Sequence, residues 1–97
     1  MKVEKRFEND VLYIAILGRL DTMTAPEFEK EVENLDGAKE IILDLKELDY
    51  LSSAGLRIIL KMQKAMIGKG SMKLRNVKPN IMEIFEITGF TDFLTIE

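Results

Sequence analysis

Residues 44–60 constrain the fold most strongly, because they pass from an apolar, β-prone segment through a turn with two adjacent serines into a helical pattern. The first N–H groups of a helix lack intrahelical partners, and that end carries about half a positive charge. A phosphate or a carboxylate is therefore favoured there. Ser52 and Ser53 lie at this end, where a hydroxyl can cap the helix or accept a modification.

The composition predicts a single domain that covers residues 1–97. The chain is 46% hydrophobic and 32% charged, and no apolar run approaches the ~20 residues of a transmembrane helix. Its charged N-terminus is unlike a signal peptide, so we expect a cytoplasmic protein with no membrane insertion. The net charge of −3 argues against nucleic acid, which binds clustered lysine and arginine, and favours a protein partner.

The absence of histidine and cysteine removes much of the chemistry that a chain of this size can perform. It excludes Ser-His and Cys-His catalysis, disulfides, and zinc held by histidine or thiolate within this chain. A hydrolase that uses Ser53 lacks both a visible base and a Gly-x-Ser-x-Gly elbow. We therefore predict a protein that is not an enzyme and that has no catalytic residue, no cofactor and no metal site.

Two segments near the N-terminus predict a β-hairpin. Residues 3–7 alternate weakly, residues 8–10 are turn-prone, and residues 11–17 form an apolar run rich in β-formers. We expect an outer first strand, a central second strand, and then a loop over residues 18–23.

The next segment carries the signals of a helix start. Thr24 is placed to cap the helix, Pro26 is tolerated in its first turn, and Glu27 completes a capping box. The helix should end at residues 36–37, where glycine accepts a left-handed conformation. Its predicted buried stripe consists of Phe28, Val32 and Leu35.

Residues 41–45 predict a second buried strand, which contains one carboxylate. Asp44 either is enclosed and takes donors from the following loop, or lies at the strand end and fixes that loop; we prefer the second interpretation. The elements expected after it are a helix from Ser53, a strand over 72–77, a helix from Pro79 to Gly89, and a strand over 93–96. The face that the helix from Ser53 should bury consists of Leu56, Ile58, Ile59, Leu60, Met62, Gln63, Met66 and Ile67.

The predicted element order is ββαβαβαβ, which belongs to the α/β class. It implies a small, mixed and mostly parallel sheet, an N-terminal antiparallel hairpin, and three main helices. Binding sites in such sheets favour the loops beyond the carboxyl ends of the strands. The loops at 21–24 and 51–54 both follow strands and precede helices, so we expect them to be neighbours.

Three motifs occur in this order along the predicted elements: residues 18–21 before the first helix, residues 42–45 on a strand, and residues 52–56 at the next helix. Together with the element order, they resemble a STAS domain. A stand-alone domain of this length is most similar to the bacterial anti-sigma factor antagonists. The resemblance covers the whole chain.

This resemblance implies a partner-switching cycle. Family antagonists bind an anti-sigma factor that is also a serine kinase with a histidine-kinase-like fold, and this binding releases a sigma factor. The kinase then phosphorylates a serine at the start of the helix and ends the interaction, and a PP2C-type phosphatase restores the active form. The alternative is a STAS subunit of a lipid-transport or stress-sensing assembly that is not phosphorylated.

The family pattern Asp-Ser-(Ser, Thr or Ala)-Gly-Leu assigns the site residues when Gly55 and Leu56 are matched to its end. Ser53 then falls on the phosphorylated serine, and Ser52, the second choice, replaces the aspartate. For both serines simple N-capping is the alternative role, and Asp21 is alternatively a loop-forming carboxylate. The expected partner surface consists of Asp21, Thr22, Met23, Thr24, Ser52, Ser53, Ala54 and Arg57.

Overall fold

In the computed structural model, which describes residues 1–97, an antiparallel hairpin begins the fold. β1 (Lys2–Glu8) and β2 (Val11–Leu20) are joined by Asn9 and Asp10, whose φ angles are 51° and 67°. Two consecutive residues with positive φ form the type of tight turn whose twist matches that of paired strands. The hairpin predicted from the sequence is confirmed, with the turn at the expected place.

β2 is long because it pairs with two different parallel strands along its length. Its first half lies beside β3 (Glu40–Asp44), and its last residues lie beside β4 (Leu48–Leu51). The register shifts between Gly18 and Arg19, and Gly18 adopts a φ of 95°, which a residue with a side chain rarely adopts. The pairing of β2 with β3 ends at Ala15, and Gly18 begins the pairing with β4, where its backbone accommodates the register shift.

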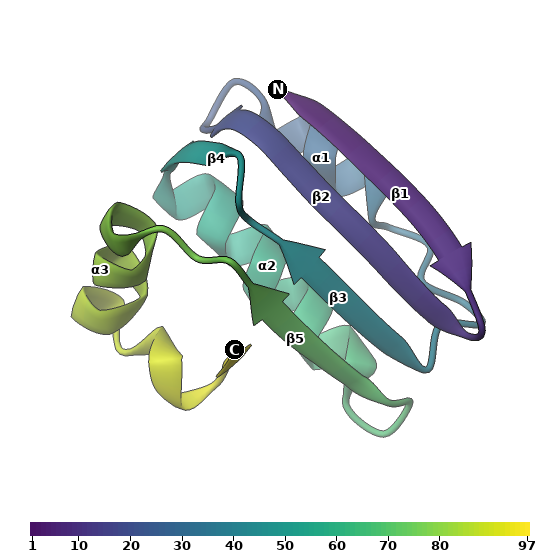
Figure 1. The fold of residues 1–97 in the computed structure, drawn as a ribbon. Helices are drawn as coiled ribbons and strands as arrows, with labels where there is room; N and C mark the ends of the chain where they lie inside the picture. The colour runs from purple at the N-terminus through teal and green to yellow at the C-terminus, as the bar shows by residue number, and fades with distance from the viewer.

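The remaining strands extend the sheet on the other side. β5 (Ser71–Arg75) pairs with β3, and β6 (Thr95–Ile96) pairs with β5, both in parallel. The order in the sheet is β1-β2-β3-β5-β6, with β4 attached to β2, and only the β1–β2 pair is antiparallel. Figure 1 shows β1 at one edge of this sheet. The predicted mixed, mostly parallel sheet is therefore confirmed.

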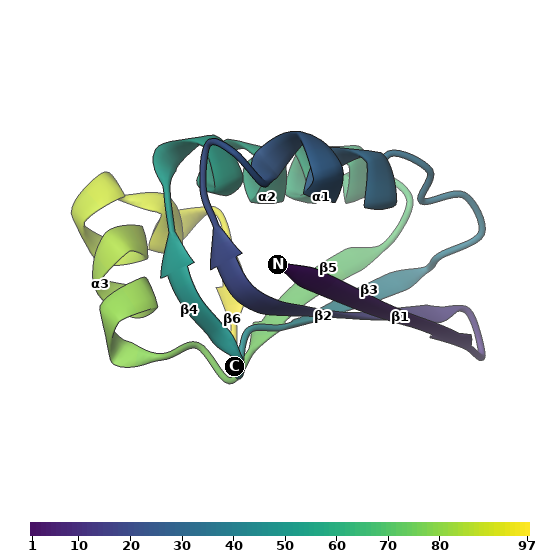
Figure 2. The same ribbon diagram turned by 90° about the horizontal axis from the view of Figure 1, so that it is seen from above.

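Two helices cover one face of the sheet. α1 (Ala25–Glu31) and α2 (Ser53–Met66) lie above it, and the opposite face carries no helix (Figure 2). α3 (Pro79–Thr88) lies at the end of the sheet beside β4, where Lys78 and Asn80 bond to Asp49. A short 3-10 helix, η1 (Phe90–Asp92), leads from α3 to β6. No helix reaches the length and apolarity that a bilayer crossing requires.

The hydrophobic core lies between the sheet and the two covering helices. It takes alternate residues from β2, β3 and β5 and one face from each helix, as the periodicities of 2 and 3.6 require. Its fully buried members include Ile14, Ile16, Phe28, Ile41, Leu43, Ile59, Met66, Met72, Leu74 and Phe85. The core therefore fixes the ends of β2 and β4 beneath the start of α2.

Several boundaries differ from the sequence prediction. Residues 18–20 continue β2 instead of forming a loop, and β4 is a strand that the sequence analysis did not predict, because only Leu48 and Leu51 of its four residues are buried. α1 ends at Glu31, before Leu35, which packs on the core from the following loop. Residues 93–94 lie outside β6.

The predicted buried face of α2 is correct except at its C-terminal end. Leu56, Ile58, Ile59, Met62 and Met66 are buried, and Leu60 and Gln63 are half-buried. The prediction that Ile67 is buried is wrong. Its side chain is 72% exposed, because the helix ends at Met66 and the backbone of Ile67 is extended.

Candidate functional site

The loops that follow β2 and β4 lie side by side. Leu20 and Leu51 face each other at the end of the parallel pair, and the N–H of Ser52 donates to the carbonyl of Leu20 at 2.9 Å. Both strands therefore deliver the chain to one edge, where α1 and α2 begin. The neighbourhood predicted for the two loops is confirmed.

The loop after β2 is closed by its own side chains. The Asp21 Oδ1 accepts hydrogen bonds from the N–H groups of Met23 at 3.0 Å and Thr24 at 3.1 Å. The Thr24 Oγ1 accepts from the N–H of Asp21 and donates to the carbonyl of Arg19, both at 2.9 Å. The polar groups of Asp21 and Thr24 are thus used within the loop, in the manner of an Asx-turn.

The same contacts favour the ionised form of Asp21. The hydrogen bond from the Thr24 backbone is the main cause that lowers the pKa of this carboxyl below its ordinary value of 3.8. Desolvation, the next largest effect, opposes it, and the Met23 N–H, the Thr24 hydroxyl and the Arg19 guanidinium, 3.6 Å away, each lower the pKa further. Asp21 therefore carries a fixed negative charge at this edge.

The predicted capping of α1 by Thr24 is wrong. Thr24 occupies the N-cap position, but its backbone is already helical and its side chain makes no capping hydrogen bond. Its hydroxyl is held by Arg19 and Asp21 instead, and no capping-box bond to Glu27 forms. The Asp21 carboxylate accepts hydrogen bonds from the N–H groups of Met23 and Thr24, which precede the first residue of α1 and have no other helical partner. Asp21 is therefore the residue that forms this loop.

The loop after β4 leaves a hydroxyl free. Ser52 is the N-cap of α2, and its Oγ accepts from the N–H of Gly55 at 3.4 Å, which is long for a hydrogen bond. Ser53 is the first residue of the helix and is exposed, with no side-chain hydrogen bond in the structure. The two serines are therefore in different situations: Ser52 is half-buried and caps the helix, and Ser53 faces solvent at its positive end.

The start of α2 lies very close to the two strands. A Cβ atom placed on Gly55 lies 2.5 Å from the Leu20 Cγ and 2.9 Å from the Leu51 Cδ1. Both leucines are buried, so neither has room to move away. Glycine at this position allows the first turn of α2, and with it Ser53, to rest directly on the ends of β2 and β4.

The rim of the site includes residues that the sequence analysis did not identify. The Arg19 guanidinium lies 4.3 Å from the ring centroid of Tyr50, which is 40% exposed, in a cation–π arrangement. Arg19 and Tyr50 face each other across β2 and β4, so their pairing depends on a strand that was not predicted. Met23 is nearby in sequence and 87% exposed, as expected for a surface residue.

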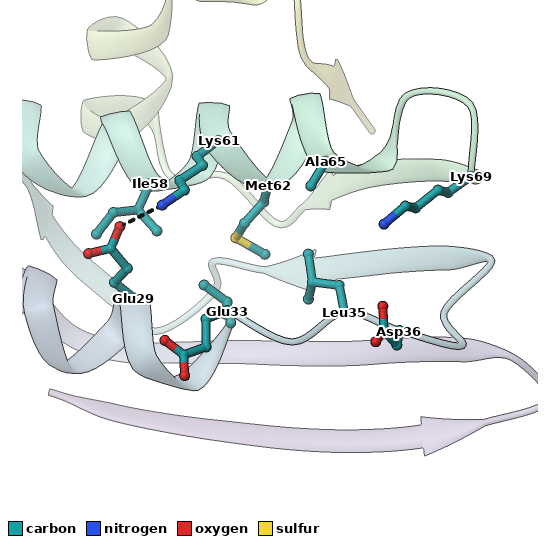
Figure 3. A pocket seen from close by; sticks show the side chains of 10 residues that line it. Glu29, Glu33, Leu35, Asp36, Ile58, Lys61, Met62, Ala65 and Lys69 are labelled. Carbon is teal, nitrogen blue, oxygen red and sulfur yellow. Dashed lines mark hydrogen bonds and ion pairs between the residues drawn. The ribbon is translucent and has the colours of Figure 1, made fainter.

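A hollow joins the two loops to the helices behind them. Its lining includes Thr22, Ala54 and Arg57 from the predicted partner surface and Pro26, Glu29 and Lys61 from α1 and α2. Glu29 and Lys61 also border a second hollow between the helices and form an ion pair of 3.1 Å across it (Figure 3). Glu29 and Lys61 could not be assigned to the site from the sequence, because only the packing of α1 against α2 brings them together.

Asp44 lies at the end of β3 and is half-buried. Its Oδ1 accepts from the N–H of Lys46 at 2.9 Å and from the Asn76 side chain at 3.1 Å. The preferred interpretation, in which Asp44 fixes the loop after its strand, is confirmed. It is therefore a structural residue of the segment that leads to β4.

Comparison with known proteins identifies the family. The STAS domain model matches residues 2–97. This chain belongs to the STAS domain family. A curated relative, the anti-sigma-B factor antagonist of Bacillus subtilis, is 34% identical over 95% of this chain and 85% of its own length.

Solved structures show the same fold. An anti-sigma factor antagonist from Mycobacterium paratuberculosis superposes with a TM-score of 0.90 at 18% identity, covering 98% of this chain and 83% of the other. The Bacillus cell fate determinant SpoIIAA in its phosphorylated form superposes with a TM-score of 0.76 at 18% identity, covering 99% of this chain and 91% of the other. The β4 strand and the helix start at Ser53 are therefore parts of a STAS fold.

Proposed function

We propose that this STAS protein is a cytoplasmic anti-sigma factor antagonist that is switched by phosphorylation of Ser53. It binds an anti-sigma factor that is also a serine kinase with a histidine-kinase-like fold, and this binding releases a sigma factor. The kinase phosphorylates Ser53 and ends the interaction, and a PP2C-type phosphatase reverses the modification. The protein acts by binding and is not itself an enzyme.

The exposed hydroxyl of Ser53 is the observation that carries this proposal. It belongs to the first residue of α2, at an edge where a closed, charged loop stands beside it. The Bacillus subtilis relative is named for antagonism of an anti-sigma factor, and SpoIIAA, which has the same fold, exists in a phosphorylated form. Both facts support a binding surface whose state depends on phosphate.

The physical basis of the switch is charge. A phosphoserine adds roughly −1.5 to −2 charges, which the free N–H groups of a helix start can accommodate without unfolding the domain. A partner that packs against neutral Ser53 has to desolvate this dianion next to the fixed charge of Asp21. Binding is then lost with little change of the backbone. The partner surface consists of Asp21, Thr22, Met23, Thr24, Ser52, Ser53, Ala54 and Arg57.

Asp21 also argues against a nucleophilic role for Ser53. A serine nucleophile needs an adjacent base. The chain has no histidine, and the lowered pKa of the Asp21 carboxyl, on the neighbouring loop, makes it a weak proton acceptor whose Oδ1 already accepts two hydrogen bonds within that loop. A kinase supplies its own base, so phosphorylation by a partner does not require one here.

The deciding experiment is incubation with the cognate kinase and ATP, followed by mass spectrometry of the peptides. We expect one phosphate on wild type and on Ser52→Ala, and none on Ser53→Ala. Ser53→Asp should bind the kinase about 30-fold or more weakly than wild type, because its charge is buried without a partner in the complex. Ser53→Ala, a neutral variant of the same position, is the matched control and should bind like wild type.

Other outcomes would redirect the proposal. Phosphate on Ser52 would move the switch by one residue, to the N-cap. No phosphate on either serine would favour a STAS subunit of a lipid-transport or stress-sensing assembly, which is consistent with Ser52 standing in the aspartate position of the family pattern. Equal binding by Ser53→Asp and Ser53→Ala would contradict the charge switch.

A further inference from the structure

β1 is an outer strand with a free edge. It pairs with β2 alone, and six of its seven residues are exposed. Figures 1 and 2 show it at the border of the sheet, with no element on its outer side. The outward N–H and C=O groups of such an edge form a template for another strand.

The two faces of β1 carry different side chains. Val3 and Phe7 face Ile16 and Leu12 of β2, on the side that the helices cover, and Phe7 is 53% exposed. The residues on the opposite, open side alternate in charge in the order Lys2, Glu4, Arg6 and Glu8. An edge that served only to prevent pairing would gain more from charges of one sign, which repel a second copy in any register.

We propose that β1 pairs with β1 of a second copy of this chain, antiparallel and about a two-fold axis at Lys5, so that the two sheets become continuous. In this register Lys2 lies opposite the second copy's Glu8, and Glu4 lies opposite its Arg6. Val3 lies opposite Phe7 on the helix-covered side, which covers the exposed ring. Residues that lie opposite each other are either both even-numbered or both odd-numbered. The N–H and C=O groups that point outward from one β1 therefore lie opposite those of the other β1 and can form hydrogen bonds with them.

The charges select this register against its neighbours. A slip of two residues in one direction places Lys2 opposite Arg6 and Glu4 opposite Glu4. The same slip in the other direction places Glu4 opposite Glu8 and Arg6 opposite Arg6. Like charges directly opposite each other destabilise a sheet, so the register centred on Lys5 is favoured over both of these. Slips of four residues also avoid like charges on the open face, but they leave much of β1 unpaired.

The two-fold axis places Lys5 opposite Lys5 of the second copy, which is the one pair of like charges in this register. The Lys5 Nζ lies 2.9 Å from the Glu31 Oε2 and donates to the Glu31 carbonyl at 3.1 Å. These bonds hold the ammonium group against the end of α1 and neutralise it within its own chain. The two-fold position is therefore occupied by two lysines that are paired within their own chains, which weakens their repulsion. The ion pairs along the open face, Lys2–Glu4 at 3.6 Å and Arg6–Glu8 at 3.7 Å, are longer and more exposed, and the dimer adds cross-strand partners to them.

The pairing involves no residue of the Ser53 site and leaves the α1–α2 side of each copy open. A strand-to-strand contact of this length buries little surface, so the dimer belongs to the weak class of interfaces. Its pairs on the open face are exposed to solvent, and salt therefore screens them. We expect self-association that depends on concentration and decreases with added salt.

Charge exchange within β1 provides the test, with association measured by sedimentation equilibrium at low salt. Glu4→Arg alone and Arg6→Glu alone should each weaken self-association at least about tenfold, because like charges then face each other twice. The double variant Glu4→Arg with Arg6→Glu should associate like wild type. An equimolar mixture of the two single variants should form the mixed dimer.

The control is Glu83→Arg, which makes the same charge change on the exposed surface of α3 and should leave association unchanged. Circular dichroism establishes that each variant is folded. A wild-type protein that stays monomeric up to millimolar concentration would overturn the proposal. So would single variants that associate like wild type, or a mixture that forms no mixed dimer.

Discussion

The junction between β2 and α1 and the junction between β4 and α2 lie side by side, and each joins a parallel strand to a helix through short polar residues. In the first, Asp21 and Thr24 bond to each other and to the loop backbone. In the second, Ser52 makes one long capping bond and Ser53 makes none. The first junction is saturated by its own side chains, and the second leaves the Ser53 hydroxyl exposed without a side-chain hydrogen bond.

If Ser53 is the switch proposed above, this difference separates the residues that stabilise the edge from the one that is regulated. A loop whose polar groups are already satisfied keeps its shape when its neighbour changes charge. A hydroxyl with no structural task can be modified without a cost to the fold. Mutations at the two junctions should therefore differ in what they change: stability at the first, and partner binding at the second, apart from the close packing beneath α2.

The largest loss of stability is expected from Gly55→Ala. Its methyl group overlaps buried Leu20 and Leu51, and overpacking of this kind costs about 1–3 kcal/mol, part of which the better helix propensity of alanine offsets. Denaturant unfolding measures the change. Ser53→Ala, two residues earlier in the same turn and exposed, is the matched control. Equal stability of the two variants would show that α2 can move away from the strands.

The second largest loss should come from Asp21→Ala, which removes the acceptor of two backbone hydrogen bonds in the loop after β2. We expect a lower midpoint of thermal unfolding than for Ser52→Ala, which removes one long bond. Asp21→Asn retains an oxygen acceptor and should lie between Asp21→Ala and wild type. If Asp21→Ala unfolds at the wild-type temperature, the loop is not held by its carboxylate.

The position of both junctions could be predicted from the sequence, but their internal bonding could not. The carboxyl ends of parallel strands meet at one edge, so the order of strands and helices was enough to place the loops at 21–24 and 51–54 together. Two short polar residues, Asp21 and Thr24, could each cap a helix start, and the sequence does not show which one does. In the structure Asp21 accepts from the N–H groups of Met23 and Thr24, and the Thr24 hydroxyl is engaged with the Arg19 carbonyl at the end of β2.

β4 could not be predicted from the sequence for a related reason. Its two buried residues, Leu48 and Leu51, are three positions apart, which is a helical spacing and not the alternation of a strand. It becomes a strand because β2 extends beyond Ala15, where its pairing with β3 ends, and its last residues pair with β4 instead. The cation–π contact of Arg19 with Tyr50 depends on that pairing, so this part of the site could not be predicted from the sequence either.

A smaller effect on stability separates the two serines. Ser52→Ala should cost about 0.5–1 kcal/mol, the low end of N-cap substitutions, because its bond to Gly55 is long. Ser53→Ala should change the free energy of unfolding by about 0.5 kcal/mol at most, as expected for an exposed residue without side-chain bonds. Denaturant unfolding of both variants in one buffer makes the comparison. A larger cost for Ser53→Ala would mean that Ser53, and not Ser52, is the cap.

The smallest expected effect is the pH dependence that Asp21 adds. Because hydrogen bonds from the Thr24 and Met23 backbone lower its pKa in the folded state below 3.8, the folded protein binds this proton less readily than the unfolded chain does. The stabilisation is therefore fully present above the unfolded pKa and is lost as the pH falls through the lower, folded pKa. Asp21→Asn lacks this titration, so the stability gap between wild type and Asp21→Asn should be constant above about pH 5 and should shrink in more acidic solution. Unfolding curves of both proteins from neutral pH to pH 3 measure the gap. A gap that stays constant down to the acid limit would mean that the loop after β2 does not prefer the ionised carboxylate, and the contrast between a saturated and an open junction would then rest on Ser53 alone.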